Sequence, residues 1–228
     1  FPYFSAYQDG ITTLTAAIPN GTSTAPIQVV STADFPSSGY IIIDQEIISY
    51  TTTTPTQFDG TITRGVLGTN SGKGAHAIGA YATEAQGSGV GTSASMVIRT
   101  VTASNAITCT IPSSKIYVTN SGYYNIQFSA QFLNYTTSVD NVTVWLRQNG
   151  VDVPASSGIV TVPSQHGTFA GATIAGWNYV NRFNAGEYFE LYWASDSGNT
   201  VIATYPKGTA PVHPESPGLI LTVTFVSA

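Results

Sequence analysis

Charged residues are scarce in this chain of 228 residues, since only 8% are Asp, Glu, Lys or Arg, whereas a typical soluble protein carries about 25%. Lysine and arginine together number 7, and the formal net charge is −5. Because a nucleic-acid-binding protein needs a basic face for the phosphates, this composition excludes that class of partner. Threonine is abundant instead. We therefore expect a surface of hydroxyl and amide groups, typical either of a protein that assembles or of a secreted β domain.

Several other features are missing. The only cysteine, Cys109, cannot form an intramolecular disulfide, and its alternating surroundings predict a packed side chain and not a nucleophile. No apolar run reaches the length of a membrane span, so no membrane contact is expected. The chain starts at Phe1 without a methionine and without the charged and apolar regions of a signal peptide. We therefore expect a processed or trimmed N-terminus.

Alternation of apolar and polar residues with a period of two recurs along the chain, whereas strong helix formers are few. The clearest example places Tyr124, Ile126, Phe128 and Phe132 on one face of a strand, with amide and hydroxyl side chains on the other. Similar patterns cover residues 142–147, 188–193 and 219–225, and Asn-Gly and related turn sequences separate them. The pattern predicts an all-β fold, an antiparallel jelly-roll sandwich.

The first third of the chain has a different pattern. Its expected strands are short and cover residues 27–30, 40–43, 46–50 and 61–64. A tract rich in glycine and serine at 86–93 is interpreted as a flexible connector. The predicted parts are residues 1–22, the first strand of the jelly roll; 23–87, a small inserted β-domain; and 88–228, the rest of the sandwich.

Residues with catalytic side chains are dispersed. His76, His166 and His213 lie far apart, and none has a second metal ligand at the usual spacing, so they are expected to be loop histidines. Asp44 and Glu46 flank a tight turn, where two carboxylates are expected to be solvated turn residues and not a hydrolase pair.

Two other acidic loops offer oxygen ligands. Asp196 and Asn199 lie in one turn, and Asp140 precedes an alternating strand. Calcium could use such oxygens, but neither loop has the ligand number of a known calcium-binding loop. We therefore predict a protein that is not an enzyme, with no catalytic residue, no metal site and no cofactor.

Aromatic residues make up 11% of the chain. Trp145, Tyr188 and Tyr192 fall on the polar faces of their strands and are expected to point away from the core. Exposed aromatic rings can stack on sugars or fill a subunit interface, and the interface is favoured because several strands carry apolar or aromatic residues on both faces.

The segment SKIYVTNSGYYNIQFSAQ at residues 114–131 resembles the strand pair at the trimer core of tumour-necrosis-factor-like jelly rolls. The opening FSAYQD at 4–9 resembles the first strand of the same fold. Together with residues 144–154, 176–179 and 184–193, these motifs are similar to a version of the fold found in virion proteins of tailed bacteriophages. The resemblance covers about residues 1–20 and 94–228, and residues 27–50, 62–69 and 75–77 are similar to a small β-module of phage tail and virion proteins.

The resemblance implies a homotrimer built around the strand at 123–132. The expected interface residues are Tyr124, Ile126, Phe128, Phe132, Tyr188 and Tyr192. It also implies a structural role in the virion, as a trimeric capsid-decorating (cement) protein or a short head fibre, with capsid or tail proteins as partners. The chain opens directly on the jelly roll, which favours a protein seated on the particle surface.

Two alternatives stay open. The first is a receptor- or glycan-binding module of a tail fibre or tail tip, using the loops at 134–141, 162–171 and 196–204. Its candidate ligand-binding residues are Tyr135, Asp140, His166, Asp196, Asn199 and Tyr205. The second is an enzyme such as a depolymerase, for which the sequence offers no catalytic motif.

Overall fold

The structure is a computed structural model that describes residues 1–21, 23–69 and 74–228. Across these residues the regular elements are strands without helices, and all strand pairs are antiparallel. The same described residues form no helix that is long and apolar enough to cross a membrane. The predicted all-β, antiparallel fold is confirmed.

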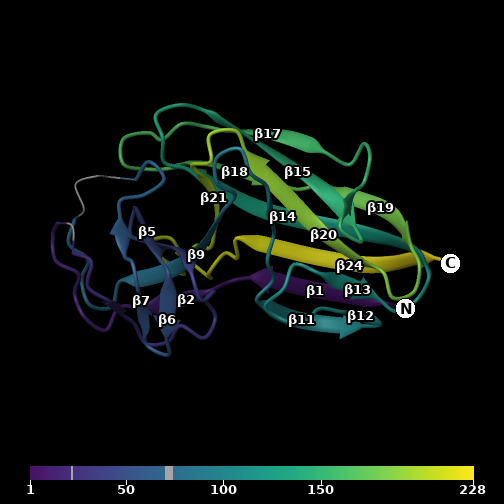
Figure 1. Cartoon of the computed structure of the whole chain (residues 1–228), viewed down its shortest axis with the longest axis horizontal. Helices are drawn as coiled ribbons and strands as arrows, with labels where there is room; N and C mark the ends of the chain where they lie inside the picture. Colours follow the sequence, from purple (N-terminus) through teal and green to yellow (C-terminus); the bar gives the residue numbers. More distant parts are fainter. Residues whose placement is uncertain (22, 70–73) are drawn as a thin grey trace.

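Two sheets face each other and form a sandwich, with both chain termini at the end far from residues 39–59 (Figure 1). The larger sheet runs in the order β11-β1-β24-β14-β21-β9-β4-β5-β8, with β18 and β19 paired to β14 and β2 paired to β9. Its strands are β1 (Tyr3–Gln8), β2 (Ile11–Thr13), β4 (Gly39–Ile43), β5 (Glu46–Tyr50), β8 (Thr63–Arg64), β9 (Tyr81–Gly87), β11 (Thr100–Asn105), β14 (Gly122–Asn134), β18 (Gly171–Ala175), β19 (Asn178–Phe183), β21 (Thr200–Ala203) and β24 (Leu219–Ser227).

The second sheet runs in the order β12-β13-β20-β15-β16, with β10 on β20 and β17 on β15. Its strands are β10 (Ala94–Ser95), β12 (Ile107–Thr108), β13 (Ile116–Val118), β15 (Asp140–Gln148), β16 (Val151–Asp152), β17 (Gly158–Val162) and β20 (Tyr188–Ser195). Two small sheets complete the described strands: β3 (Ile27–Gln28), β6 (Thr52–Thr54) and β7 (Gln57–Asp59) in one, and β22 (Gly208–Thr209) and β23 (Val212–His213) in the other.

The core of the sandwich is formed by the apolar residues that alternate with polar residues along its strands. Along β14 the apolar side chains point inward and are buried, and the ring of Phe132 lies 5.3 Å from that of Trp193 on β20. Phe128 packs edge-on against Trp177, with ring centroids 4.8 Å apart. Burial of these rings stabilises the sandwich because large apolar surfaces leave water.

The trimer interface predicted on the inner face of β14 is wrong. Tyr124, Ile126, Phe128 and Phe132 are all buried within a single chain. They are covered by the second sheet of the same sandwich and are therefore not available to another subunit. Tyr188 and Tyr192 differ from them, because both are half-buried on the outer face of the second sheet.

The segment from β2 to β9 packs around an apolar core of its own. We call residues 11–87 the module; it lies at the left in Figure 1. Its core side chains are Leu14, Ile18, Ile27, Val29, Phe35, Ile41, Ile43, Ile48, Tyr50, Phe58, Ile62 and Ala82. The boundary predicted at residue 22 falls outside the described residues. The strand expected over 27–30 is shorter, since β3 ends at Gln28.

The module is joined to the sandwich by a continuous sheet, because β9 pairs with β21 on one side and with β4 on the other. A third apolar cluster lies at this seam and combines Ile42 and Ile47 of the module with Leu133, Tyr135 and Val201 of the sandwich. The seam therefore holds the β4–β5 hairpin in a defined position against the end of the sandwich.

The interpretation of residues 86–93 as a flexible connector is wrong at its start. Gln86 pairs with Ile202 in the larger sheet, and its side-chain amide exchanges hydrogen bonds of 3.1 Å with the backbone of Val97. The hydroxyl of buried Ser88 accepts a hydrogen bond from the amide of Ser195. Gln86 and Ser88 are therefore tied to neighbouring strands by hydrogen bonds and do not belong to a free linker.

Candidate functional site

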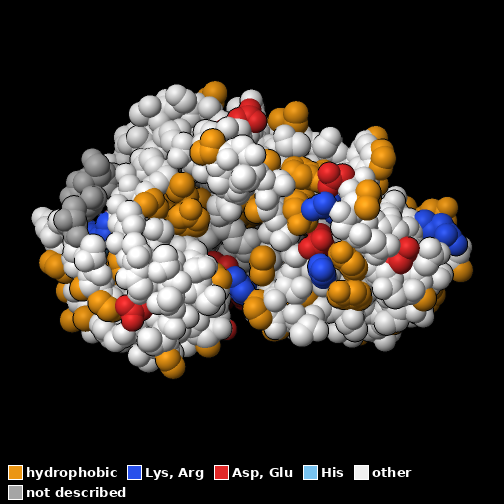
Figure 2. Space-filling view, viewed as in Figure 1, with side chains coloured by type: hydrophobic (Ala, Val, Ile, Leu, Met, Phe, Trp, Pro, Cys, Tyr) orange, Lys and Arg blue, Asp and Glu red, His pale blue; other side chains and the backbone are white. Residues whose placement is uncertain are grey.

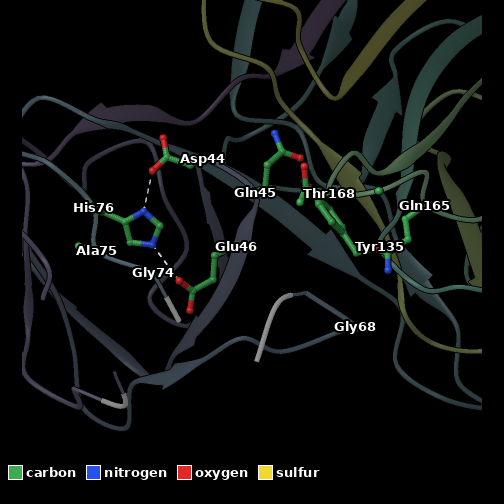
Figure 3. A pocket seen from close by; sticks show the side chains of 11 residues that line it. Asp44, Gln45, Glu46, Gly68, Gly74, Ala75, His76, Tyr135, Gln165 and Thr168 are labelled. Carbon is green, nitrogen blue, oxygen red and sulfur yellow. Dashed lines mark hydrogen bonds and ion pairs between the residues drawn. The ribbon is translucent and has the colours of Figure 1, made fainter. Parts of the chain in front are cut away.

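A cleft separates the turn of the β4–β5 hairpin from the loops at the adjacent end of the sandwich (Figure 3). One cavity of about 470 Å³ is lined by Asp44, Gln45 and Tyr135, among others. A second cavity of about 300 Å³ has the same three residues in its lining and extends to Phe169 and Tyr205. Because the two cavities share these residues, they are parts of one cleft, which we call the hairpin cleft.

On the module side of the hairpin cleft, His76 lies between two carboxylates. Its Nδ1 is 2.7 Å from Oδ2 of Asp44, and its Nε2 is 2.8 Å from Oε2 of Glu46. Arg64 completes the chain of contacts, with Nε 3.0 Å from Oε1 of Glu46 and Nη2 2.6 Å from Oε2. Arg64 also donates hydrogen bonds to three backbone carbonyl oxygens, those of Pro19, Gly21 and Gly74. We call Asp44, Glu46, Arg64 and His76 the acid–His cluster.

Charge in the acid–His cluster is balanced by these contacts. Burial alone would raise the pKa of Glu46, but hydrogen bonds from His76 and Arg64 hold that pKa below its ordinary value. Burial alone would lower the pKa of His76, but hydrogen bonds to Glu46 and Asp44 raise it. We infer that both ring nitrogens of His76 carry a proton and donate to the two carboxylates.

This arrangement positions a carboxylate at the hairpin cleft. The side chains of His76 and Glu46 are only 4% and 6% exposed, whereas that of Asp44 is 62% exposed. Both ring nitrogens of His76 are occupied by carboxylates, so the imidazole is not placed to take a proton from a ligand. The acid–His cluster therefore fixes the hairpin turn and presents the Asp44 carboxylate to the cleft.

The prediction of solvated turn acids is wrong for Glu46, and His76, which lies outside the named strands as expected of a loop histidine, is buried as well. Both side chains are buried because Arg64 and His76, which are distant from the turn in sequence, converge on it. The other two histidines, His166 and His213, are exposed.

A second buried acid, Asp140, ties the two loops that were considered as calcium ligands. It accepts hydrogen bonds from the hydroxyls of Ser195, Ser197 and Thr200 at 2.5, 2.8 and 2.6 Å, and from the backbone amide of Ser197 at 3.0 Å. Burial alone would raise the pKa of Asp140, but these hydrogen bonds lower it. Since the carboxylate is surrounded by donors, it serves as a cap for the β20–β21 turn.

Within the described residues, no three His, Cys, Asp or Glu side chains are grouped so that they could hold a metal ion. Asp196 and Asn199 lie in the turn capped by Asp140, with the Asp196 amide donating to the Asn141 carbonyl.

Five of the six predicted ligand-loop residues fall into two groups, and His166 belongs to neither. Tyr135 and Tyr205 line the hairpin cleft, and Gln165 and Gly167 on either side of His166 line it as well. Asp140, Asp196 and Asn199 meet in the separate β20–β21 turn. The sequence predicts no ligand-binding role for Asp44 and Gln45 and covers Phe169 only as part of the candidate loop 162–171, although the fold brings all three residues to the same cleft.

No protein-family model matches this chain, and no curated protein matches it.

Proposed function

We propose that this protein is a structural component of a tailed-phage virion, a homotrimer with a tumour-necrosis-factor-like jelly-roll fold that sits on the particle surface. The sequence motifs support the fold and the phage origin. The observation that carries the assembly is the unequal distribution of charge between the two outer faces of the sandwich.

The outer face of the larger sheet is almost uncharged. Six of its strands, β1, β11, β14, β18, β19 and β24, carry a single charged side chain, Arg182. Exposed aromatic and aliphatic side chains lie among amides and hydroxyls on these strands, with Tyr3 and Tyr123 prominent and Gln127 exposed at the centre. Gln127 pairs with Thr222 on one side and Asn178 on the other.

The outer face of the second sheet carries charges instead. Arg147 stacks on Tyr192 with 4.3 Å from the guanidinium carbon to the ring centroid, and its Nε lies 2.9 Å from Oδ1 of Asp152. Lys115 lies over Tyr188 at 4.8 Å. Figure 2 shows charged and hydrophobic side chains together over the region of β15 and β20.

A face with these properties suits burial between subunits. Bringing charges into a closed interface costs desolvation energy, whereas neutral amides, hydroxyls and aromatic rings can be buried with hydrogen bonds made across the interface. We therefore place the trimer contact on the outward-facing residues of β14 and its neighbours, including Tyr123 and Gln127. The charged second sheet then faces solvent or other virion proteins.

Light scattering of the purified protein tests the assembly. We expect a mass of three chains of 23.9 kDa each. Gln127→Arg places a charge at the centre of the proposed contact and should release smaller species, whereas Thr143→Arg on β15 of the charged face should leave the mass unchanged. A monomer mass for the parent protein, or equal effects of both variants, contradicts the proposed contact.

Cryo-electron microscopy and mass spectrometry of purified particles test the location. The chain is expected in the particle as density with threefold symmetry on its surface. If the protein is absent from intact particles, the proposed virion role is wrong, even if the protein forms the proposed trimer.

A further inference from the structure

We infer that the hairpin cleft is a binding site for an uncharged oligosaccharide, with Phe169 and Tyr205 as stacking surfaces and the turn residues Asp44 and Gln45 as hydrogen-bonding partners. The site lies within one chain, so the inference does not depend on the trimer or on the virion role.

The hairpin cleft contains aromatic side chains that are exposed to solvent. Phe169 is 69% exposed and Tyr205 is 37% exposed, and both line the same cavity as Tyr81 and Tyr135. The exposed ring of Phe169 places apolar surface in water, which is unfavourable. A ligand with an apolar face therefore gains binding free energy by covering that ring. The C–H faces of a pyranose ring supply such a surface.

The hairpin cleft also contains polar groups that can form hydrogen bonds with a ligand. Asp44 and Gln45 occupy the turn of the β4–β5 hairpin and line both cavities. A carboxylate accepts two or more O–H donors, and a primary amide both donates and accepts, which matches vicinal hydroxyls of a sugar. Burial raises the pKa of Tyr205, and burial and the nearby Tyr205 raise that of Tyr135, so both phenols keep their protons at neutral pH.

The charge of the cleft narrows the class of ligand. Asp44 is the charged side chain in the lining of the second cavity, which otherwise consists of apolar, aromatic, hydroxyl and amide groups. His76 offers no free cation to a ligand, because both of its ring nitrogens already contact carboxylates. A phosphate, nucleotide or acidic sugar would find no cation among the described residues that line the second cavity, so a neutral sugar fits best.

The lining residues are held by local hydrogen bonds before any ligand arrives. The turn that presents Phe169 is closed by two backbone hydrogen bonds with His166, of 2.9 and 3.1 Å. Tyr205 is fixed by a reciprocal backbone pair with Ser216, of 2.9 and 3.0 Å. Asp44 is fixed by His76. Such preorganisation lowers the entropy cost of binding, and a volume of about 300 Å³ in the second cavity suits a small ligand.

The experiment uses the full chain and a defined probe. A glycan array of neutral and acidic oligosaccharides is read first, and the strongest neutral binder is then titrated by calorimetry. Phe169→Ala should weaken binding at least about tenfold, as expected of an aromatic residue at the centre of a site. Its high exposure makes this variant safe for folding. Tyr205→Ala should weaken binding too.

Tyr117→Ala is the matched control, because Tyr117 is 38% exposed, close to Tyr205, but lies on the second sheet. It should bind as the parent does. Three outcomes overturn the inference: no neutral oligosaccharide binds at millimolar concentration, Phe169→Ala binds as the parent does, or Phe169→Ala changes the mass measured by light scattering without sugar, which would assign the cleft to contact between copies.

Discussion

Removal of the Arg64 guanidinium is the sharpest test of the acid–His cluster. Arg64 and Glu46 form a bidentate pair whose side chains are 1% and 6% exposed. Arg64→Met keeps most of the aliphatic bulk but leaves the Glu46 carboxylate in the interior with His76 as its remaining charged partner. Breaking a buried pair by removal of one partner costs about 3–5 kcal/mol. In a domain of this size, 1 kcal/mol changes Tm by about 2–4 °C, so we expect Tm to fall by about 6–20 °C.

The assay is thermal and urea unfolding followed by circular dichroism, with Lys207→Met as the control because Lys207 is an exposed cation. The control should change the free energy of unfolding by no more than about 0.5 kcal/mol. The double variant Glu46→Gln with Arg64→Met removes the uncompensated carboxylate and should be more stable than Arg64→Met alone. A loss below about 1 kcal/mol for Arg64→Met, or no recovery in the double variant, would refute the reasoning.

Three further predictions follow from the same structure. Burial alone would lower the pKa of His76, but hydrogen bonds to Glu46 and Asp44 raise it above 6.5, so its stabilisation is complete below about pH 6.5 and is lost as the pH rises through the raised value. Unfolding free energies between about pH 6 and pH 8.5 should therefore fall, and fall less in His76→Gln; equal slopes would contradict this. Phe128→Ala removes the ring that packs on Trp177 and should cost about 3–5 kcal/mol in urea unfolding, with a loss below about 1 kcal/mol as the contrary result. Burial raises the pKa of the Cys109 thiol to about 11, so alkylation by iodoacetamide near pH 8 should be at least about tenfold slower in the native protein than in urea, and equal rates would show that Cys109 is exposed.

The sandwich could be predicted from the sequence because its strands alternate strictly. On β14 and β15, each apolar residue of the pattern is buried in the structure and its polar neighbours face outward. Alternation identifies which residues share a face, but it does not identify what covers that face. The alternation is therefore equally compatible with a second subunit and with a second sheet over the inner face of β14, and in the structure the second sheet of the same chain covers it.

The hairpin cleft was only partly predictable for a related reason. Tyr135 and Tyr205 are aromatic residues in loops and could be recognised as candidates. Asp44 and Gln45 reach the same cleft only because β9 pairs with both β21 and β4, which carries the module hairpin to the end of the sandwich. Such long-range pairing leaves no local sequence signal, and neither does the convergence of Arg64 and His76 on Glu46.

The scarcity of charge has a stronger meaning once burial is known. Glu46, Glu84, Arg64 and Asp140 are all buried, and Arg99 is held by Glu84 with Nη2 2.8 Å from Oε1. These residues stabilise the module, its seam with the sandwich and the β20–β21 turn, and they contribute little to the surface. Part of the chain's 8% of charged residues is therefore not available to the surface. A low surface charge favours association, and the six strands β1, β11, β14, β18, β19 and β24 carry only Arg182 as a charged residue, which makes this part of the larger sheet the face suited to a subunit contact.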